Sequence, residues 1–581
     1  MKVVYQKKIK TYSESIVLFS IGLILTTGSF LVKNQFVSAV IHFNKFLERT
    51  EIISFLMLIY ATLFFIAGAC SFYFSLKKLS LQNLFFESLK ETISFIRKFF
   101  VDLYNYGFSP AEKIWLFGAI LTGLVIRAYF VAAPLRGDEA ATHYFFVQGH
   151  FHNSFEYHTP NNHVLHTLLA RLMVNLFGDN QFALRFPAFL AGALCVPLIF
   201  IVAQRLSGKK SGILAMLLMT IFPIILIFDT MARGYSLVNF FTLTGIIIGN
   251  SMINENTFSR TLIFALNSAL GIFVIPTFLF PAVGLYIWVG VFVLNQTRNI
   301  FYIARSFIFP SVSLLILFTF IFYTPVILVE NSISHLISNE WVKPVDWGQF
   351  FGISPFHFEQ TVSIMLSGIP YFLRMLTGMF VVLGLIMLVL KRKPKALLLL
   401  ISFVSGTLIL YFAKHSITYS RTWLYLLPVI FLVADSGFTF IISELNRLIR
   451  RISFVLAFSF MIVAGILLIN TDTITNSNYY DSFPEAKIVA TYFSANLIKG
   501  DTMQMDYPGA FPVHYYMRNQ NKSFVNPPDS NYIPKCYFVI KKGQNKLVDL
   551  AHQNPVKIFE LGDAEIYVAA RDTSIKKLFV E

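Results

Sequence analysis

Arg136-Gly137-Asp138-Glu139-Ala140 follows directly on an apolar run that ends near Ala133, and it opens a polar, histidine-rich segment that extends to about Asn180. Carboxylates beside hydrocarbon are costly, and they persist mainly where they line a cavity or find partners. We therefore interpret Asp138 and Glu139 as the centre of a functional site where a membrane helix meets water. The simpler alternative is a Gly-Asp-Glu turn that only caps the following helix.

The composition around this stretch is that of a polytopic membrane protein. The chain has 581 residues, of which 56% are hydrophobic and only 13% are charged, whereas about a quarter of the residues of a soluble protein are charged. The formal net charge of +16 lies largely in short loops between apolar runs, where it sets topology. No basic patch with the spacing of a nucleic-acid site occurs, so we expect no nucleic-acid partner.

Apolar runs near the roughly 20 residues that cross a bilayer predict about thirteen membrane helices. The runs at 260–275 and 277–295 are separated only by Pro276 and form either a tight hairpin or one broken element. The runs are 14–33, 52–76, 113–133, 183–203, 212–229, 235–253, 260–275, 277–295, 306–328, 371–390, 396–412, 422–442 and 452–470.

Alternating the loops between these runs places the basic clusters on one face, which the positive-inside rule identifies as the cytoplasm. The opposite face carries 134–182, the turn from Asp229 to Tyr235, the loop 329–370 and everything after Asn470. Asp138 and Glu139 are thus expected outside the cytoplasm.

Three regions are predicted. Residues 1–110 form an accessory two-helix membrane hairpin followed by an amphipathic helix on the cytoplasmic surface. Residues 111–470 form the transmembrane core. Residues 471–581 alternate helical and strand patterns and predict a small extracytoplasmic α/β domain. The fold class is therefore a polytopic all-α membrane protein with a C-terminal α/β domain.

Three motifs in order resemble a known family. Gly137-Asp138-Glu139-Ala140 is followed by Pro160-Asn161-Asn162-His163 and then by Ala183-Leu184-Arg185-Phe186-Pro187-Ala188 at the entry to the next span. This order is similar to that of the GT-C glycosyltransferases, and within them to the protein O-mannosyltransferase and lipid A aminoarabinose transferase branch, often called family 39. The resemblance is strongest over about 112–240.

The resemblance implies a carboxylate in the first extracytoplasmic loop that faces a lipid-phosphate-linked sugar. Transfer to a hydroxyl needs an acceptor that loses its proton as it attacks, and a carboxylate within hydrogen-bond distance can take that proton. We assign this role to Asp138, with Glu139 as a neighbour that orients the acceptor or shares its proton.

The departing phosphate needs cations more than an acid. Arg185 is our first candidate because a guanidinium group binds two phosphate oxygens at once, and Arg233 is the second. Lys414 and Arg421 are further candidates on the same face. For each of them the alternative is a charge that anchors its helix at the headgroups.

The remaining candidates for substrate contact are His163, Asn162, Asp229 and Tyr235. Asp229 is a second site carboxylate, a helix cap or an ion partner of Arg233. His163 stands where the family more often has a Lys-Pro-Pro segment, so the phosphate role of that lysine is left unfilled. We expect no cofactor; if a divalent ion binds, His143, His163 and His166 are its candidate ligands.

The loop 329–370, which contains Trp341 and Trp347, is predicted to be a flexible lid without regular structure. The alternative is a plain interfacial plug.

The predicted function is transfer of one sugar from a polyprenyl-phosphate carrier to an extracytoplasmic acceptor, a protein, lipid or glycan, with inversion at the anomeric carbon. The predicted location is a bacterial plasma membrane, where membrane lipids surround the chain; the alternative is the endoplasmic reticulum membrane. An alternative within the enzyme class is transfer of a preassembled glycan from a pyrophosphate-linked lipid. From another class, a lipid-linked sugar transporter would show polar mid-membrane helices and repeated halves, and a non-catalytic scaffold would need no site.

Overall fold

The protein is described by a computed structural model. It describes residues 110–208, 211–330, 344–445, 447–471, 473–475, 482–498, 500–505, 509–518, 535–541, 556–561 and 564–570, with scattered positions between 89 and 101. The predicted spans 14–33 and 52–76 lie outside these residues. The chain divides into two compact units, of which the first contains 244–339 and 402–408 and the second contains 108–243, 340–401 and 409–581.

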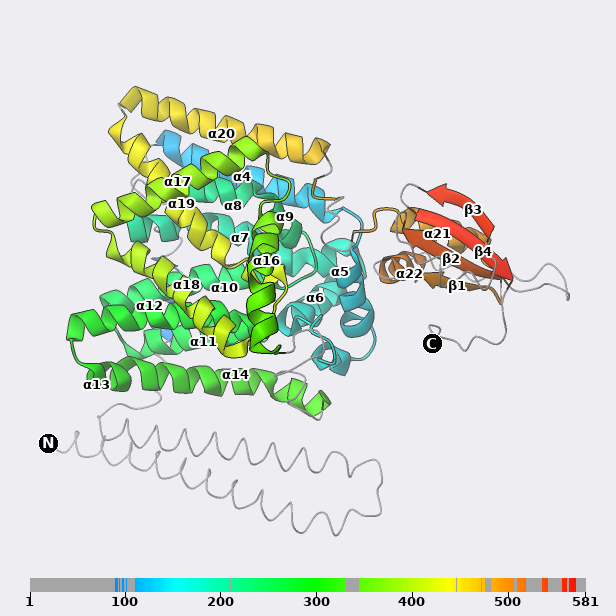
Figure 1. Cartoon of the computed structure of the whole chain (residues 1–581), viewed down its shortest axis with the longest axis horizontal. Helices are drawn as coiled ribbons and strands as arrows, with labels where there is room; N and C mark the ends of the chain where they lie inside the picture. The colour runs from blue at the N-terminus through cyan, green and yellow to red at the C-terminus, as the bar shows by residue number, and fades with distance from the viewer. Residues whose placement is uncertain are drawn as a thin grey trace, which may run out of the picture. The chain divides into compact units, whose positions relative to one another are not determined.

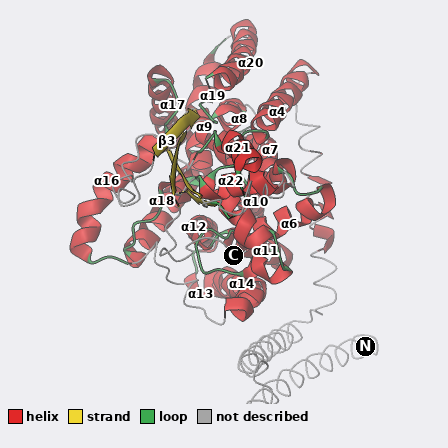
Figure 2. Ribbon diagram, turned by 90° about the vertical axis from the view of Figure 1, so that its right-hand side faces the viewer, coloured by secondary structure: helices red, strands yellow, loops and turns green. Residues whose placement is uncertain are grey.

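Helices make up nearly all of the described chain outside one small sheet (Figure 1, Figure 2). Eight of them are long and apolar enough to cross a bilayer, which confirms a polytopic helical membrane protein. These candidate spans are Gln181–Ser207, Tyr235–Asn254, Pro276–Gln296, Ser306–Glu330, Tyr371–Leu390, Pro394–Lys414, Leu426–Glu444 and Ile452–Asn470.

Three further predicted spans are shorter or broken. The apolar parts of α4 (Pro110–Val131) and α11 (Phe258–Val274) are shorter than a full span. The run 212–229 is two helices, α8 (Ile213–Ile221) and α9 (Pro223–Asp229). The break falls at Phe222, which is extended because a residue before proline avoids the helical region.

In the first unit, α11 is followed by the short turn Pro276–Phe278 and α12 (Leu279–Thr297), so the two apolar runs are separate helices. The chain continues through α13 (Ile300–Ile303) and a π-helical turn, Ala304–Ile308, into α14 (Phe309–Glu330). The hydroxyl of Tyr323 donates to the carbonyl of Ile272 at 2.8 Å and joins α14 to α11.

The second unit contains the helices that carry the predicted site. After α4 come α5 (Gly137–Thr142), α6 (Val164–Phe177), α7 (Gln181–Ser207), α8, α9 and the start of α10 (Tyr235–Asn254). Later helices are α16 (Trp347–Met365), α17 (Tyr371–Leu390), α18 (Pro394–Lys414), α19 (Leu426–Glu444) and α20 (Arg447–Asn470).

Helices α17 and α19 approach each other closely through glycine. A Cβ atom placed on Gly384 would lie 1.9 Å from the carbonyl oxygen of Val433, and one on Gly437 would lie 2.3 Å from that of Phe380. Small residues at a helix contact let backbones approach in the membrane, where apolar burial drives little association.

The segment after α20 forms the predicted small α/β domain. Helices α21 (Ala486–Asn496) and α22 (Ala510–Arg518) accompany a four-stranded sheet with the order β1-β2-β4-β3. Strand β1 (Thr502–Met505) is parallel to β2 (Lys535–Lys541), and β4 (Ala564–Ala570) is antiparallel to both β2 and β3 (Val556–Leu561).

This domain shares a hydrophobic core with the segment that carries the predicted site. Val489 and Phe493 of α21 and Val513 of α22 are buried in one cluster with Leu135 and Leu184. The domain is therefore packed against the α4–α5 connection, the region that the sequence singled out.

Candidate functional site

Asp138 and Glu139 occupy the first turn of α5, a six-residue helix that begins after the Pro134-Leu135 connection. Consecutive residues of an α-helix point about 100° apart. The two carboxylates therefore enter different surroundings, and the adjacent pair splits into two separate roles.

Glu139 is fully buried and fixes the backbone around it. Its Oε1 accepts from the backbone N–H of Arg136 at 2.7 Å, and its Oε2 accepts from that of Ala232 at 2.9 Å. Both oxygens also pair with the guanidinium group of Arg185, whose Nε lies 2.9 Å from Oε2. Glu139 thus ties α5 to α7 and to the turn after α9.

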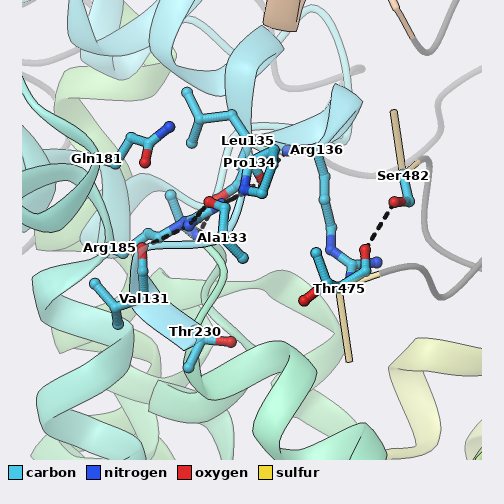
Figure 3. Close-up of polar contacts among 12 residues, drawn as sticks. Val131, Ala133, Pro134, Leu135, Arg136, Gln181, Arg185, Thr230, Thr475 and Ser482 are labelled. Atoms are coloured by element: carbon cyan, nitrogen blue, oxygen red, sulfur yellow. Dashed lines mark hydrogen bonds and ion pairs between the residues drawn. The ribbon is translucent and has the colours of Figure 1, made fainter. Parts of the chain in front are cut away.

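Arg185, our first candidate for the phosphate, uses all its donors inside the protein. Beyond Glu139, its two terminal nitrogens donate to the carbonyls of Val131 at 2.7 Å, Ala133 at 2.5 Å and Pro134 at 3.0 Å (Figure 3). An arginine has five N–H donors, and all five are engaged. Arg185 therefore holds the end of α4, and the phosphate role passes to other cations.

Asp229 forms a second buried clamp. Its Oδ2 accepts from Nε of Arg127 at 2.9 Å and from Nη2 at 2.7 Å, and its Oδ1 accepts from the hydroxyl of Ser236 at 2.6 Å. Both members of the pair are buried. Asp229 therefore pairs with Arg127 of α4, not with Arg233 as one reading of the sequence had it, and it joins α9 to α4.

Asp138 keeps partial access to solvent, with 15% of its side chain exposed. Its Oδ2 lies 3.2 Å from Nη1 of Arg421 and 3.7 Å from Nη2 of Arg233. One carboxylate oxygen is thus shared by two arginines from distant parts of the sequence, and Arg421 is itself 19% exposed.

Arg233 is buried and also organises the loop before α6. Its Nη1 donates to the carbonyl of Asn161 at 2.8 Å, to the side-chain oxygen of the same residue and to the hydroxyl of Thr142 at 3.2 Å. The amide of Asn161 in turn donates to the backbone carbonyl of Asp138 at 3.1 Å. The Pro-Asn-Asn-His segment and α5 are therefore joined around one guanidinium group.

His163 stands at the N-terminus of α6 beside Arg233. Its Nδ1 accepts from the backbone N–H of Gly234 at 2.7 Å, so a neutral imidazole carries its proton on Nε2, which lies 3.2 Å from Nη2 of Arg233. Burial, reinforced by the positive charges of Arg233 and Arg421, holds the pKa of His163 well below 6.5. The imidazole is neutral, and its Nε2 lies beside the guanidinium group of Arg233.

Two other predicted contact residues hold the surroundings of His163 and Arg233 in place. Asn162 is buried, donates to the carbonyls of Ser154 at 3.0 Å and Glu156 at 2.7 Å, and accepts from Thr167 at 2.7 Å. Tyr235 is buried and places its ring edge-on to His163 with centroids 5.1 Å apart. Asn162 therefore fixes the loop fold, and Tyr235 fixes the plane of the imidazole.

The three candidate metal-ligating histidines have different surroundings. Nε2 of His143 lies 2.9 Å from Oδ1 of Asp179, and its ring packs edge-on against Tyr515. His166 is fully buried, and burial with the nearby charge of Arg233 lowers its pKa to about 3. Within the described part of the chain, no group of three or more potential ligands with metal-binding spacing is found.

Arg421 lies in the short turn Ser420–Trp423, where its guanidinium carbon stacks 4.5 Å from the ring centre of Tyr419. Helix α16 supports this turn, because Thr361 donates to the hydroxyl of Ser420 at 3.0 Å. The prediction that 329–370 lacks regular structure is thus wrong for Trp347–Met365, while Trp341 lies outside the described residues. Lys414 is exposed at the end of α18 and forms no ion pair with a carboxylate of the described residues.

The ion-paired groups of this region leave a positive excess. Four guanidinium groups, those of Arg127, Arg185, Arg233 and Arg421, face the three carboxylates of Asp138, Glu139 and Asp229. The buried pairs Glu139–Arg185 and Asp229–Arg127 are each neutral. The excess positive charge therefore lies on the group formed by Asp138 and its two arginines.

Three contributors were not singled out from the sequence. Arg127 could have been found as a lone charge inside an apolar run, and Asn161 belongs to a motif whose neighbours were chosen instead. Tyr516 carried no signal, since it lies 377 residues beyond Glu139 in α22. Its hydroxyl accepts from the backbone N–H of Leu135 at 3.0 Å and also meets the amide of Gln181.

Comparisons with known proteins agree with this architecture. Residues 160–328 match the model of the dolichyl-phosphate-mannose-protein mannosyltransferase family, while a search of curated proteins found no match. Among solved structures, the chain is similar to apo ArnT from Cupriavidus metallidurans, with 10% identity, coverage of 79% of this chain and 98% of that one, and a TM-score of 0.51.

Two further structures have lower TM-scores. They are ArnT from the same organism bound to undecaprenyl phosphate, with 11% identity, coverage of 78% and 98% and a TM-score of 0.49, and the arabinosyltransferase EmbB from Mycobacterium smegmatis, with 11% identity, coverage of 66% and 34% and a TM-score of 0.38. The chain thus has an ArnT-like fold over most of its length, and residues 160–328 match the mannosyltransferase family, both of which agree with the resemblance to GT-C glycosyltransferases seen in the sequence.

Proposed function

We propose that the protein transfers a single sugar from a polyprenyl-phosphate-linked donor to a hydroxyl of an extracytoplasmic acceptor. The acceptor oxygen attacks the anomeric carbon, and the bond from that carbon to the phosphate oxygen breaks. The acceptor proton passes to Asp138, and the carrier leaves as a phosphate monoester. The product is inverted at the anomeric carbon because a single displacement occurs.

The observation that carries this proposal is the position of Asp138. Glu139 and Asp229 are each buried and neutralised by an arginine of their own, whereas Asp138 is partly exposed and shared by Arg233 and Arg421. A general base has to reach the acceptor hydroxyl, which a buried clamp cannot do. Asp138 is the member of this group that a substrate can approach.

The same group is suited to hold the departing phosphate. Arg421 supplies a partly exposed guanidinium group, and Arg233 and the Nε2–H of His163 are donors that converge beside it. An oxygen anion bound between them would accept from both, and such preorganised donors stabilise charge that develops in the transition state. His163 thus takes the place of the lysine that the sequence lacks.

The donor class is supported by the family match over 160–328 and by the positive excess around Asp138. A phosphodiester carries one negative charge, which that excess balances. The distribution of basic loops along the sequence supports an extracytoplasmic site in a plasma membrane.

The test is to incubate the purified protein with a panel of radiolabelled polyprenyl-phosphate sugars, with and without a chelator, and to follow release of the carrier. Release from at least one single-sugar donor is expected. Turnover confined to pyrophosphate-linked glycans and abolished by the chelator would instead support oligosaccharide transfer. No release from any donor, with intact folded protein, would leave a transporter or a scaffold as the better reading.

A further inference from the structure

The charges around Asp138 disfavour binding of a positively charged sugar. Arg233 and Arg421 both face it, and the nearby carboxylates Glu139 and Asp229 are already paired with Arg185 and Arg127. Among these ion-paired groups, one bound phosphodiester anion uses up the excess of one positive charge. A cation on the sugar would therefore meet two guanidinium groups with no carboxylate of its own among these residues.

Two buried imidazoles lie close to the same guanidinium charge. His163 is the N-cap residue of α6, and His166 lies in the first turn of that helix. Both are neutral because burial and the charge of Arg233 disfavour the imidazolium form. A sugar ammonium at this place would experience the same field and the same loss of water.

The unused hydrogen-bonding groups beside Arg233 point to hydroxyl groups. Neither ring nitrogen of His166 has a hydrogen-bond partner, and Nε of Arg233 also lacks one. A neutral imidazole offers one donor and one acceptor, which is the combination that a hydroxyl group satisfies. His166 has no exposed surface, so its contact with a sugar requires the side chains that cover it to move.

We infer that the donor carries an uncharged, hydroxyl-bearing sugar held beside His163 and His166, and that the site rejects an amino sugar. This inference rests on the proposed function. It separates the two activities that the family resemblance left together, since a mannosyl group is neutral and an aminoarabinosyl group is a cation. The inference also predicts that the preference for a hydroxyl sugar over an amino sugar depends on the charge of the amine and not on its size.

The first experiment compares two polyprenyl-phosphate donors that differ only in a hydroxyl or an amino group on the same sugar carbon. A unit charge about 6 Å from a guanidinium group in partly buried surroundings predicts a preference of about 100-fold in kcat/KM for the hydroxyl donor. The preference should narrow as pH rises through the pKa of the sugar amine. Equal use of both donors, or a preference that does not change with pH, would overturn the inference.

The second experiment separates recognition of the sugar from folding. His166→Leu should raise KM for the preferred donor about 10-fold, at the level of a lost hydrogen bond in a buried site, and His166→Gln, which keeps one donor and one acceptor, should restore most of it. Binding of sugar-free undecaprenyl phosphate should stay unchanged in both variants. His152→Gln is the matched control, because that histidine lies in the same segment with 60% of its side chain exposed.

A role of His166 that is only structural would weaken binding of sugar-free carrier and sugar donor equally, and that result would count against contact with the sugar. The donor comparison uses the unmodified protein, so it decides the charge question even if the variants fold poorly. Failure to use any donor would contradict the proposed function, whereas use of the amino sugar alone would contradict only this inference.

Discussion

Replacing Glu139 by Gln tests whether this residue is a clamp or a catalytic partner. Its two oxygens accept from Arg136 at 2.7 Å, from Ala232 at 2.9 Å and from two nitrogens of Arg185. However a Gln amide is turned, its NH₂ group faces N–H donors. The change also leaves the buried charge of Arg185 uncompensated.

Breaking a buried ion pair by removing one partner costs about 3–5 kcal/mol. We therefore expect Glu139→Gln to lower the thermal stability of the purified protein strongly. Asp138→Asn, at a pair that is partly exposed, should change the free energy of unfolding by about 1 kcal/mol or less. Neighbouring carboxylates thus serve as matched controls for each other.

The assay is thermal unfolding in detergent, followed by the loss of the monodisperse peak in size-exclusion chromatography. A double-mutant cycle with Arg185→Gln should show coupling, because the double variant no longer buries an unpaired charge. Two results would refute the assignment of a structural role to Glu139 and a catalytic role to Asp138. One is a Glu139→Gln protein as stable as the parent protein, and the other is a strong loss of stability in Asp138→Asn instead.

Arg421→Ala should lower kcat/KM by about 100-fold, because the departing phosphate loses a stabilising cation. Lys414→Ala, at the exposed end of α18, should change kcat/KM little. Equal effects of the two variants in a steady-state assay would argue against binding of the phosphate by Arg421. Tyr516→Phe should lower the free energy of unfolding by about 1–3 kcal/mol, because the backbone N–H of Leu135 loses its hydrogen-bond partner. It should also reduce kcat, measured as the rate of carrier release. Tyr371→Phe is the control, because Tyr371 is exposed. The pKa of about 3 for His166 implies that protonation below pH 6.5 favours the unfolded chain. Stability should therefore be full above pH 6.5 and fall by roughly 1.4 kcal/mol per pH unit between 6.5 and 3, and unfolding curves of His166→Leu should show a shallower fall.

The sequence predicted the membrane fold and grouped several residues that lie together in the structure, because both depend on local signals. Long apolar runs predict helices whatever their partners, and the order of three motifs placed Asp138, Arg185 and His163 in one region. Arg185 and Asp229 were predicted to contact the substrate, yet the polar atoms of each are engaged by hydrogen bonds within the protein. The number of donors already engaged depends on tertiary contacts such as that between Arg127 and Asp229, which are 102 residues apart.

The sequence of helix α16 contained a helical pattern that the sequence analysis did not recognise. Its buried residues Phe350, Ser354, His357, Thr361 and Met365 recur at helical spacing, and Asp346 caps its start by accepting from Gln349. Three of the five are polar, so the buried face did not look hydrophobic. The role of Tyr516 had no such signal, because it arises only when the C-terminal domain packs against Leu135.

The central claim is that Asp138 takes the acceptor proton while Glu139 only holds the fold. The most direct measurement is the rate of carrier release by purified Asp138→Asn protein, with a donor that the parent protein uses, alongside its thermal unfolding. We predict a rate lowered by about 10²–10⁴-fold with unfolding unchanged. A rate equal to that of the parent in correctly folded protein would contradict the claim.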